Sequence, residues 1–408
     1  MKKITIVGGG TAGWLSALFF RKFHPNLEVT LIESSKIGTI GVGEGTTPNI
    51  QSFLRKIDID KNDFLEKTNA TKKIGIDFIN WPGDGSNYLH DFFVNGNMNH
   101  AYHFQSDLIG NYLKNIGISR NVTLIDDEVV SFDKTGNNIT KIYLKTGDSI
   151  DTEFVIDCSG FSRLVLGKEL GGEWISHQDD LTLNTALTFH LPLKDGEYHD
   201  TETFTRTKAI AMDYGWMWNI PLQNRWGCGY VYDNNHITND EAKDEITKYF
   251  NQSIQFNKTI NFECGYFKDV WIGNTIAIGL SGGFFEPIEA TSIMTITSQL
   301  LQLAGNGLES YARDGHNKFM KDYNQQVFSF IKYHYVCDKN NTKFWDNHQK
   351  NNLPNRLNQL LDSNRKLKVF QNDKLKSIMS DNDYVIFDVY SYAMLSAGNF
   401  KKNTNLLL

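Results

Sequence analysis

Three glycines near the N-terminus have the spacing of a site that binds a nucleotide diphosphate. Gly8, Gly10 and Gly13 form a GxGxxG pattern between a β-branched run and a run with apolar residues at helical spacing. The first glycine permits a tight turn, the second lets a pyrophosphate approach, and the third lets helix and strand pack closely. The N–H groups at the start of the helix would face the phosphates. Glu33 lies twenty residues after Gly13, where a carboxylate accepts hydrogen bonds from ribose hydroxyls.

A β-α-β unit has to position these residues, and the flanking sequence predicts one. Residues 3–7 are typical of a buried strand, residues 11–23 of a helix, and residues 27–34 of a second buried strand. The glycine pattern therefore lies at a strand-to-helix turn and the acid at the end of the second strand. This context makes a dinucleotide site the favoured interpretation, with a turn that binds no ligand as the alternative.

Other glycines favour FAD over NAD as the dinucleotide. Residues 38–48 (GTIGVGEGTTP) are glycine-rich, and residues 154–160 (FVIDCSG) and 277–287 (AIGLSGGFFEP) each contain a short strand that ends in glycine. Several glycine-ended strands around one nucleotide suit a long cofactor whose parts contact the backbone at several places. A second GxGxxG for NADPH is absent from the sequence, so a flavin bound here would be reduced elsewhere.

Two tryptophans one residue apart stand out in the stretch YGWMWNIP. Alternation puts Trp216 and Trp218 on one face of an extended strand, and Pro221 ends that strand or confines it to a sheet edge. The segments 181–193 and 225–232 are expected to be strands that flank it. A core strand is the simpler interpretation, and a rigid wall of indoles is the functional one.

Composition sets limits on the partners and the compartment. The chain has 408 residues, a net charge of −6 and no basic tract, so nucleic acid is not expected as a partner. No apolar run is long enough to cross a bilayer. The four cysteines form no CxxC pair and no zinc-ligand spacing, which predicts reduced thiols, a cytoplasmic protein and no metal site. An aromatic content of 13% suits a pocket for a flat ligand.

The chain resembles the flavin-dependent tryptophan halogenases, and within them the shorter, bacteriophage-type relatives. The motifs that carry the resemblance occur in the family's order between Lys3 and about His348: GGGTAGW, IES, GVGEGTTP, NATKKIGIDFINW, HAYHF, IDCSG, GWMWNIP, GYVY, IGLSGGFFEPIEATS and KFWDNH. The resemblance implies an α/β fold with a Rossmann-like FAD-binding module of the flavin monooxygenase and halogenase type in residues 1–330. It also implies a β-sheet inserted at 176–240 and a shortened, mostly helical substrate module in residues 331–408.

The activity that this resemblance implies is halogenation of an aromatic ring. Reduced FAD as a co-substrate, O2 and a halide ion would give hypohalous acid, and a separate flavin reductase would supply the reduced flavin. Alignment of FINW with the family's motif implies that Lys73 points inward and Lys72 points into solvent. The resemblance further implies that Lys73 passes the halogen to a small aromatic substrate. Burial would favour the neutral, nucleophilic amine. Glu289 would assist as the ring loses its proton, whereas Glu286 is expected to be structural.

The resemblance assigns cofactor and halide contacts as well. The expected FAD contacts are Gly8, Gly10, Thr11, Ala12, Gly13, Glu33, Ser34, Ile37, Val42, Gly43, Glu44, Val130, Leu280 and Ile293. The backbone N–H groups of Thr291 and Ser292 would bind the halide. Where the family often has Ser-Thr-Gly, this chain has Ala290, Thr291 and Ser292, and we expect this difference to allow bromide or iodide.

A wall and a substrate pocket complete the implied site. The wall between flavin and substrate would consist of Trp216, Trp218, Ile220 and Pro221. His90, Phe92 and Phe387 would contact the substrate ring.

The substrate is expected to be an electron-rich indole or phenol. The short C-terminal region has no clear counterpart for residues that bind an amino acid's amine and carboxylate, which argues against free tryptophan. The alternatives are a flavin-dependent aromatic hydroxylase and an FAD-binding protein without turnover. The sequence leaves open whether the protein forms a homo-oligomer.

Overall fold

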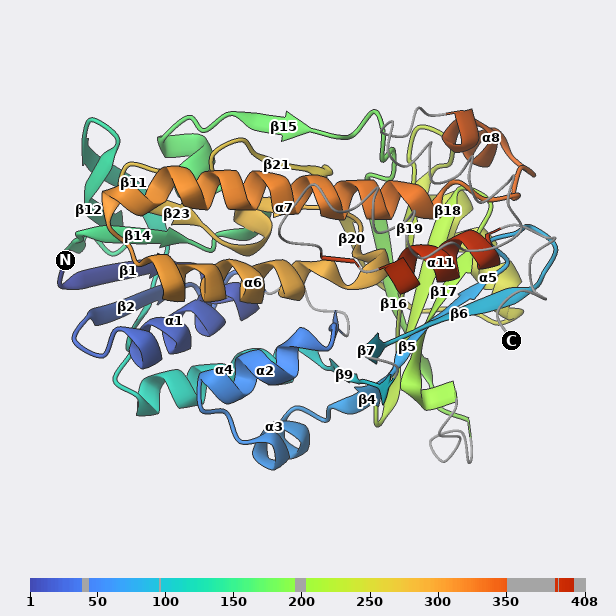
Figure 1. Cartoon of the computed structure of the whole chain (residues 1–408), viewed down its shortest axis with the longest axis horizontal. Helices are drawn as coiled ribbons and strands as arrows, with labels where there is room; N and C mark the ends of the chain where they lie inside the picture. The colour runs from blue at the N-terminus through green and yellow to red at the C-terminus, as the bar shows by residue number, and fades with distance from the viewer. Residues whose placement is uncertain (39–43, 95–96, 195–202, 351–385, 388, 400–408) are drawn as a thin grey trace. The chain divides into compact units, whose positions relative to one another are not determined.

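The computed structural model describes residues 1–38, 44–94, 97–194, 203–350, 386–387 and 389–399 (Figure 1). The chain divides into two compact units of three segments each. The first unit comprises Met1–Thr71, Ala101–Ser176 and Gly265–Asp322, and the second comprises Lys72–His100, His177–Cys264 and Tyr323–Leu408. This division differs from the expected boundary after residue 330, because strands from residues 72–100 join the same sheet as the expected insert.

The first unit is built on a six-stranded sheet of the expected β-α-β type. Its strand order is β10-β2-β1-β14-β23-β22, with bounds Thr123–Asp126, Glu28–Glu33, Lys3–Val7, Phe154–Asp157, Thr275–Ala277 and Trp271–Ile272. The first five strands are parallel and β22 is antiparallel. The sequences of β1 and β14 are short apolar runs, because both faces of a parallel sheet are covered by helices and loops and are therefore buried.

The helices that accompany this sheet are α1 (Thr11–Phe23), α2 (Asn49–Lys56), α3 (Lys61–Lys67), α4 (Ser106–Ser119) and α6 (Thr291–Asn306). α1 packs against β1 and β2, and the other helices pack around it or around one another. α1 follows β1 directly and contacts both α4 and α6. The predicted unit of strand, glycine turn, helix and parallel strand is therefore confirmed.

Small sheets and short helical turns complete the first unit. The strands are β3 (Glu44–Gly45), β9 (Ala101–Phe104), β11 (Val129–Thr135), β12 (Asn138–Leu144), β13 (Ser149–Asp151), β15 (Trp174–Ser176), β21 (Gly265–Phe267) and β24 (Gly283–Phe284). The turns are η1 (Gly160–Ser162), η2 (Leu164–Glu169), η5 (Gly279–Ser281), η6 (Pro287–Glu289) and η7 (Ser310–Ala312). β4 (Thr71–Lys73) carries the chain from the first unit to the second.

The second unit is built on a seven-stranded sheet with the tryptophan strand at its centre. The strand order is β20-β16-β19-β18-β17-β5-β6, with bounds Phe256–Asn261, Thr185–Pro192, Arg225–Tyr232, Gly215–Pro221, Arg206–Ala211, Gly75–Ile79 and Asn87–Asp91. The segment 225–232 flanks the tryptophan strand β18, as predicted. The prediction for 181–193 was wrong in position, because β17 is the other neighbour and β16 lies one strand further away. Pro221 ends β18, which is an interior strand.

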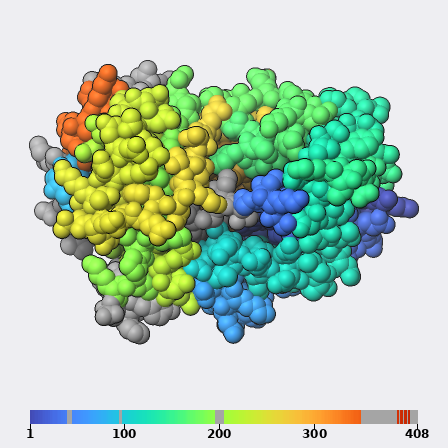
Figure 2. Space-filling model, turned by 180° about the vertical axis from the view of Figure 1, so that it is seen from behind, coloured from blue at the N-terminus to red at the C-terminus, as the bar shows by residue number. Residues whose placement is uncertain are grey.

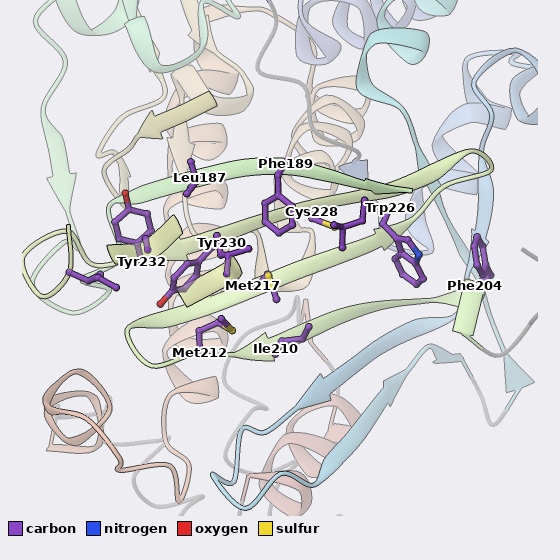
Figure 3. Packing of buried hydrophobic residues seen from close by; sticks show 14 residues of the cluster. Leu187, Phe189, Phe204, Ile210, Met212, Met217, Trp226, Cys228, Tyr230 and Tyr232 are labelled. Atoms are coloured by element: carbon purple, nitrogen blue, oxygen red, sulfur yellow. The ribbon is translucent and has the colours of Figure 1, made fainter. Parts of the chain in front are cut away.

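The two faces of this sheet have different partners. On one face, Met217, Cys228 and Tyr230 belong to a buried cluster that includes Ala242 and Ile246 of α5 (Asn239–Phe250) (Figure 3). α5 begins at a capping box formed by Thr238 and Glu241. The segment that contains α5 is yellow in the space-filling view, where it lies at the molecular surface (Figure 2). The opposite face carries the side chains of Trp216 and Trp218, because alternate residues of β18 point to opposite faces.

Three helices and a short hairpin accompany the sheet. They are α7 (Arg313–His334), α8 (Lys343–Lys350), α11 (Val389–Gly398) and the pair β7 (Phe93–Val94) and β8 (Asn97–Met98). The first of these helices, α7, begins in the first unit, before Tyr323. α11 contacts β6. Among the described residues, no helix combines the length and the apolar character that a bilayer crossing requires.

Candidate active site

The glycine turn after β1 has the three backbone features that a dinucleotide requires. Gly8 has a φ of +113°, and a Cβ there would lie 2.2 Å from the Cys158 carbonyl oxygen. A Cβ on Gly13 would lie 1.9 Å from the Gly8 carbonyl oxygen. A Cβ on Gly10 would meet nothing within 4 Å. Gly8 and Gly13 are thus required by the fold, whereas Gly10 leaves space beside the first turn of α1.

Glu33 is held firmly at the end of β2. Its Oε2 accepts a hydrogen bond from Trp14 Nε1 at 3.1 Å, and its Oε1 forms an ion pair with the Lys114 ammonium. Gly9 has no room for a side chain, because a Cβ there would lie 2.0 Å from Glu33 Oε2. A carboxylate fixed beside the glycine turn suits hydrogen bonds from a ribose. The residues of this turn therefore fit an FAD adenosine diphosphate.

The other expected cofactor residues differ in what the structure says of them. Thr11 and Ala12 form the first turn of α1, and the Ser34 hydroxyl accepts the Lys36 N–H at 3.3 Å. Ile37 and Val130 are 68% and 58% exposed, which leaves apolar surface available to a ligand.

The remaining members of that set lie deeper or outside the described part of the chain. Ile293 is buried and Leu280 is half-buried. Val42 and Gly43 lie outside the described residues, and for Glu44 only the backbone in β3 is described. The assignment of all these residues to FAD stays a prediction.

Glu289 and the expected halide residues meet at the start of α6. Glu289 ends η6 and is 2% exposed. Ala290 has a φ of +55°, and α6 begins at Thr291 without a side-chain cap. The first N–H groups of a helix have no partner within the helix, so those of Thr291 and Ser292 can bind an anion beside the positive end of the helix dipole. Their role as halide ligands stays a prediction.

Cys158 lies beside the glycine turn but is unsuited to nucleophilic chemistry. Burial raises the pKa of its thiol far above the ordinary value, and a thiol that stays protonated is a poor nucleophile.

Lys73 is buried, as the alignment with the family's motif predicts. It is 1% exposed, whereas Lys72 is exposed. The Lys73 Nζ lies 5.3 Å from the centroid of the Phe92 ring. A buried amine against an aromatic face has little competition from water. Lys73 is thus the buried lysine of the pair, and its role in halogen transfer stays a prediction.

The expected substrate residues belong to one aromatic cluster in the second unit. The ring centroids of His90 and Phe92 are 6.5 Å apart, and those of His90 and Phe330 are 6.1 Å apart. Phe330 of α7 stacks on Phe387, with the two ring centroids 3.8 Å apart. His90 Nε2 also makes a hydrogen bond with the Ser391 hydroxyl at 3.1 Å. Sequence reasoning missed Phe330 and Ser391, because neither lies in a motif.

The two indoles lie together on the sheet face that also carries His90. The Trp216 and Trp218 ring centroids are 6.1 Å apart. Pairing places Trp218 opposite Ala209, and Ala209 opposite Phe78. Phe78 is two residues from Ile76, which pairs with His90; alternate and directly opposed residues share a face.

Small residues across the strands leave room for these indoles. A Cβ on Gly229 would lie 2.2 Å from Trp218 Cζ2, so the Trp218 ring occupies the space that a side chain on β19 would need. Ile220 is buried on the same face, and Pro221 closes the strand. The sequence predicted this wall only in part, because Ala209 and Gly229 follow no recognisable motif.

Comparisons with known proteins agree with this arrangement. The sequence matches the family described as tryptophan halogenase over residues 3–98 and 93–399. It is 28% identical to tryptophan 6-halogenase SttH from Streptomyces toxytricini, over 87% of this chain and 82% of that protein. It is also 28% identical to tryptophan 7-halogenase RebH from Lentzea aerocolonigenes, over 89% of this chain and 82% of that protein.

Solved structures of halogenases share the fold. The SttH crystal structure superposes with a TM-score of 0.89 at 26% identity, covering 98% of this chain and 91% of that one. Xcc4156, a flavin-dependent halogenase from Xanthomonas campestris, gives a TM-score of 0.88 at 26% identity, covering 98% and 88%. These findings support the family and do not support the narrower resemblance to bacteriophage-type relatives. The chain belongs to the tryptophan halogenase family and is a flavin-dependent halogenase.

Proposed function

We propose that this chain uses reduced FAD, O2 and a halide ion to make hypohalous acid, and that Lys73 passes the halogen to an electron-rich indole or phenol. The observation that carries the proposal is the placement of a buried amine, 5.3 Å from the Phe92 ring centroid, within a cluster of aromatic side chains. A family match over most of the chain supports the reaction class.

The first unit would hold the cofactor through its backbone. Gly10 leaves the pyrophosphate room to approach, and the N-terminus of α1 stabilises its negative charge. Glu33 would accept hydrogen bonds from the ribose while Trp14 and Lys114 keep its carboxylate in place. When bound in its reduced form, FAD supplies the two electrons that, with O2, convert halide and a proton into hypohalous acid and water.

Lys73 would control where the halogen goes. Its amine carries the halogen or holds hypohalous acid by a hydrogen bond, and its burial keeps the electrophile from water. If hypohalous acid is held by a hydrogen bond, transfer to the ring forms a carbon–halogen bond and breaks the oxygen–halogen bond, and the departing oxygen becomes water. If the amine carries the halogen, water leaves when the nitrogen–halogen bond forms, and transfer to the ring breaks that nitrogen–halogen bond and restores the amine. The ring C–H then loses its proton, for which Glu289 is the proposed acceptor.

The tryptophan wall would protect the substrate from the oxidant. Trp216 and Trp218 are buried, closely spaced and backed by interior strands on both sides. Ile220 and Pro221 continue the wall to the end of β18. Such a surface offers little hydrogen bonding to the oxidant, so halogen transfer would depend on Lys73 alone.

The substrate proposal rests on the aromatic cluster. His90, Phe92, Phe330 and Phe387 offer flat faces that suit an indole or phenol ring. Both SttH and RebH carry tryptophan halogenase in their names, so free tryptophan is the natural comparison substrate. The C-terminal residues 351–385 lie outside the described part of the chain, and the sequence argument against free tryptophan remains a proposal.

The decisive test is a reaction of the whole protein with FAD, a flavin reductase, NADH and bromide. A panel of indoles, phenols and free tryptophan is read by the bromine isotope pattern in mass spectrometry. We expect brominated indole or phenol, and less product from free tryptophan. Products that gain oxygen independently of bromide would favour the hydroxylase alternative. Flavin binding without any product would favour a protein without turnover.

A further inference from the structure

A partly buried ion pair spans three strands next to the residues proposed to act on the substrate. Arg206 of β17 binds Asp91 of β6 through two hydrogen bonds, Nε to Oδ1 at 2.7 Å and Nη2 to Oδ2 at 2.8 Å. The side chains are 17% and 11% exposed. Paired guanidinium and carboxylate groups in this bidentate geometry are strong and directional. The pair therefore fixes both the distance and the orientation of β6 relative to β17.

A glycine on the intervening strand makes this contact possible. β5 lies between β17 and β6, and Gly75 pairs with Arg206 on one side and with Asp91 on the other. A Cβ on Gly75 would lie 2.4 Å from Asp91 Oδ1. The Asp91 carboxylate thus uses the space above Gly75 to reach across the middle strand to Arg206.

Backbone hydrogen bonds tie the same three segments together one residue away. The Ile74 N–H donates to the Thr205 carbonyl at 2.7 Å, and the Phe92 N–H donates to the Ile74 carbonyl at 2.7 Å. Ile74 directly follows Lys73. The backbone hydrogen bonds and the side-chain bridge therefore lie side by side at the start of β5, two residues after Lys73.

We propose that Asp91 and Arg206 are positioning residues that hold Lys73 against Phe92. Asp91 lies between His90 and Phe92 in the sequence, so its carboxylate fixes the end of β6 that carries His90 and that leads directly into Phe92. This inference rests on the proposed role of Lys73, because it assigns a cause to the placement of that amine. Loss of the bridge lets the end of β6 move relative to β5, so that the halogen reaches water instead of the ring.

The same sheet offers a matched control carboxylate. Asp77 is two residues along β5 from Gly75 and accepts a hydrogen bond from Asn87 Nδ2 at 2.9 Å. Burial raises the pKa of the Asp77 carboxyl. The charged groups that act on Asp77 electrostatically are Lys208, Arg206 and Asp91. Asp77→Asn removes a neighbouring carboxylate without touching the bidentate bridge. It therefore separates a change of local charge from loss of the bridge itself.

The test measures how the halogen divides between substrate and solution. Wild type, Asp91→Asn, Arg206→Lys and Asp77→Asn react with an electron-rich indole and bromide in the presence of catalase and monochlorodimedone as a diffusible trap. We expect the ratio of brominated indole to brominated trap to fall at least about tenfold in Asp91→Asn and Arg206→Lys, since small misplacements cost this much or more. The summed bromination and FAD binding should stay at the wild-type level, as should every readout of Asp77→Asn.

Two results would overturn the positioning role. One is an unchanged ratio in both bridge variants, and the other is an equal fall in Asp77→Asn. Arg206→Lys keeps the charge but loses the planar fork, so it tests the same geometry if Asp91→Asn does not fold.

A readout that needs no turnover separates this inference from the proposed function. Lys73 labelling by an amine-directed reagent, followed by peptide mass spectrometry, should be several-fold faster in the bridge variants than in wild type and Asp77→Asn. If wild type brominates nothing, the proposed function fails, and labelling alone decides whether the bridge holds Lys73. Equal labelling rates in all four proteins would contradict the inference.

Discussion

The two units of this protein build their sites in different ways. The site in the first unit consists largely of backbone, namely a glycine turn and two helix N-termini, with Glu33 as its main side chain. The site in the second unit consists of side chains that three distant segments bring together, with Lys73 and His90 from one, Trp218 from another and Phe330 from a third. A backbone site tolerates few substitutions at its glycines, whereas a side-chain site depends on the register of its strands.

Gly13→Ala should give the largest effect on the first unit. The new Cβ would lie 1.9 Å from the Gly8 carbonyl oxygen, so the turn or α1 has to move. We expect a loss of at least about 3 kcal/mol in the free energy of unfolding together with loss of FAD binding. Urea denaturation and flavin titration measure the two effects. Wild-type stability would show that the close packing of the turn is not required.

Acid should destabilise the two units through one buried histidine in each. Burial lowers the pKa of His316 and of His348 to about 4. The folded state therefore disfavours their protonation while the unfolded state accepts it near pH 6.5, so stability is present above pH 6.5 and falls as the pH drops toward 4.

The residue-specific test is His348→Phe in the second unit and His316→Gln in the first. Each should remove about 2 kcal/mol of the stability lost between pH 7 and pH 5, because the new side chain does not titrate. Urea denaturation at both pH values measures the difference. A variant whose stability falls as steeply as that of wild type would show that its histidine is protonated in the fold as well.

Gly229→Ala should test the side-chain site by crowding the wall. Its Cβ would lie 2.2 Å from Trp218 Cζ2, so the indole has to tilt. We expect a loss of about 1–3 kcal/mol in the free energy of unfolding and a lower yield of halogenated product, with FAD binding unchanged. A parallel loss of FAD binding would show that the effect is not confined to the second unit.

Gly10→Ala should separate binding from folding in the first unit. The position is open and its φ is −73°, so alanine fits the free protein and stability should change by less than about 0.5 kcal/mol. The methyl group would stand where a pyrophosphate approaches, and we expect FAD affinity to fall about tenfold, or 1.4 kcal/mol. Unchanged affinity would place the phosphates elsewhere.

Halide choice is the smallest effect that we predict. Thr291 and Ser292 present backbone N–H groups at the start of α6 after the left-handed Ala290. We expect bromide, and to a lesser extent iodide, to compete with chloride in product formation. Competition at equal concentrations, read by mass spectrometry, measures this, and strict chloride preference would contradict it.

The sequence predicted the first unit better than the second, for a physical reason. Gly8, Gly10, Gly13 and Glu33 act locally, within one strand, one turn and the next strand. β17 was missed as the neighbour of β18 because strand pairing joins residues far apart, and an apolar pattern does not identify a partner. Phe330 lies on a helix with no motif, so only tertiary packing shows that it joins the candidate site.

The most direct test of the account compares Lys73→Ala with Lys72→Ala in the bromide reaction, with FAD binding measured on the same samples. The account predicts that Lys73→Ala lowers brominated product at least about 100-fold, whereas Lys72→Ala resembles wild type and both bind FAD normally. Wild-type yields of brominated product from folded Lys73→Ala protein would contradict the claim that this buried amine passes the halogen to the substrate.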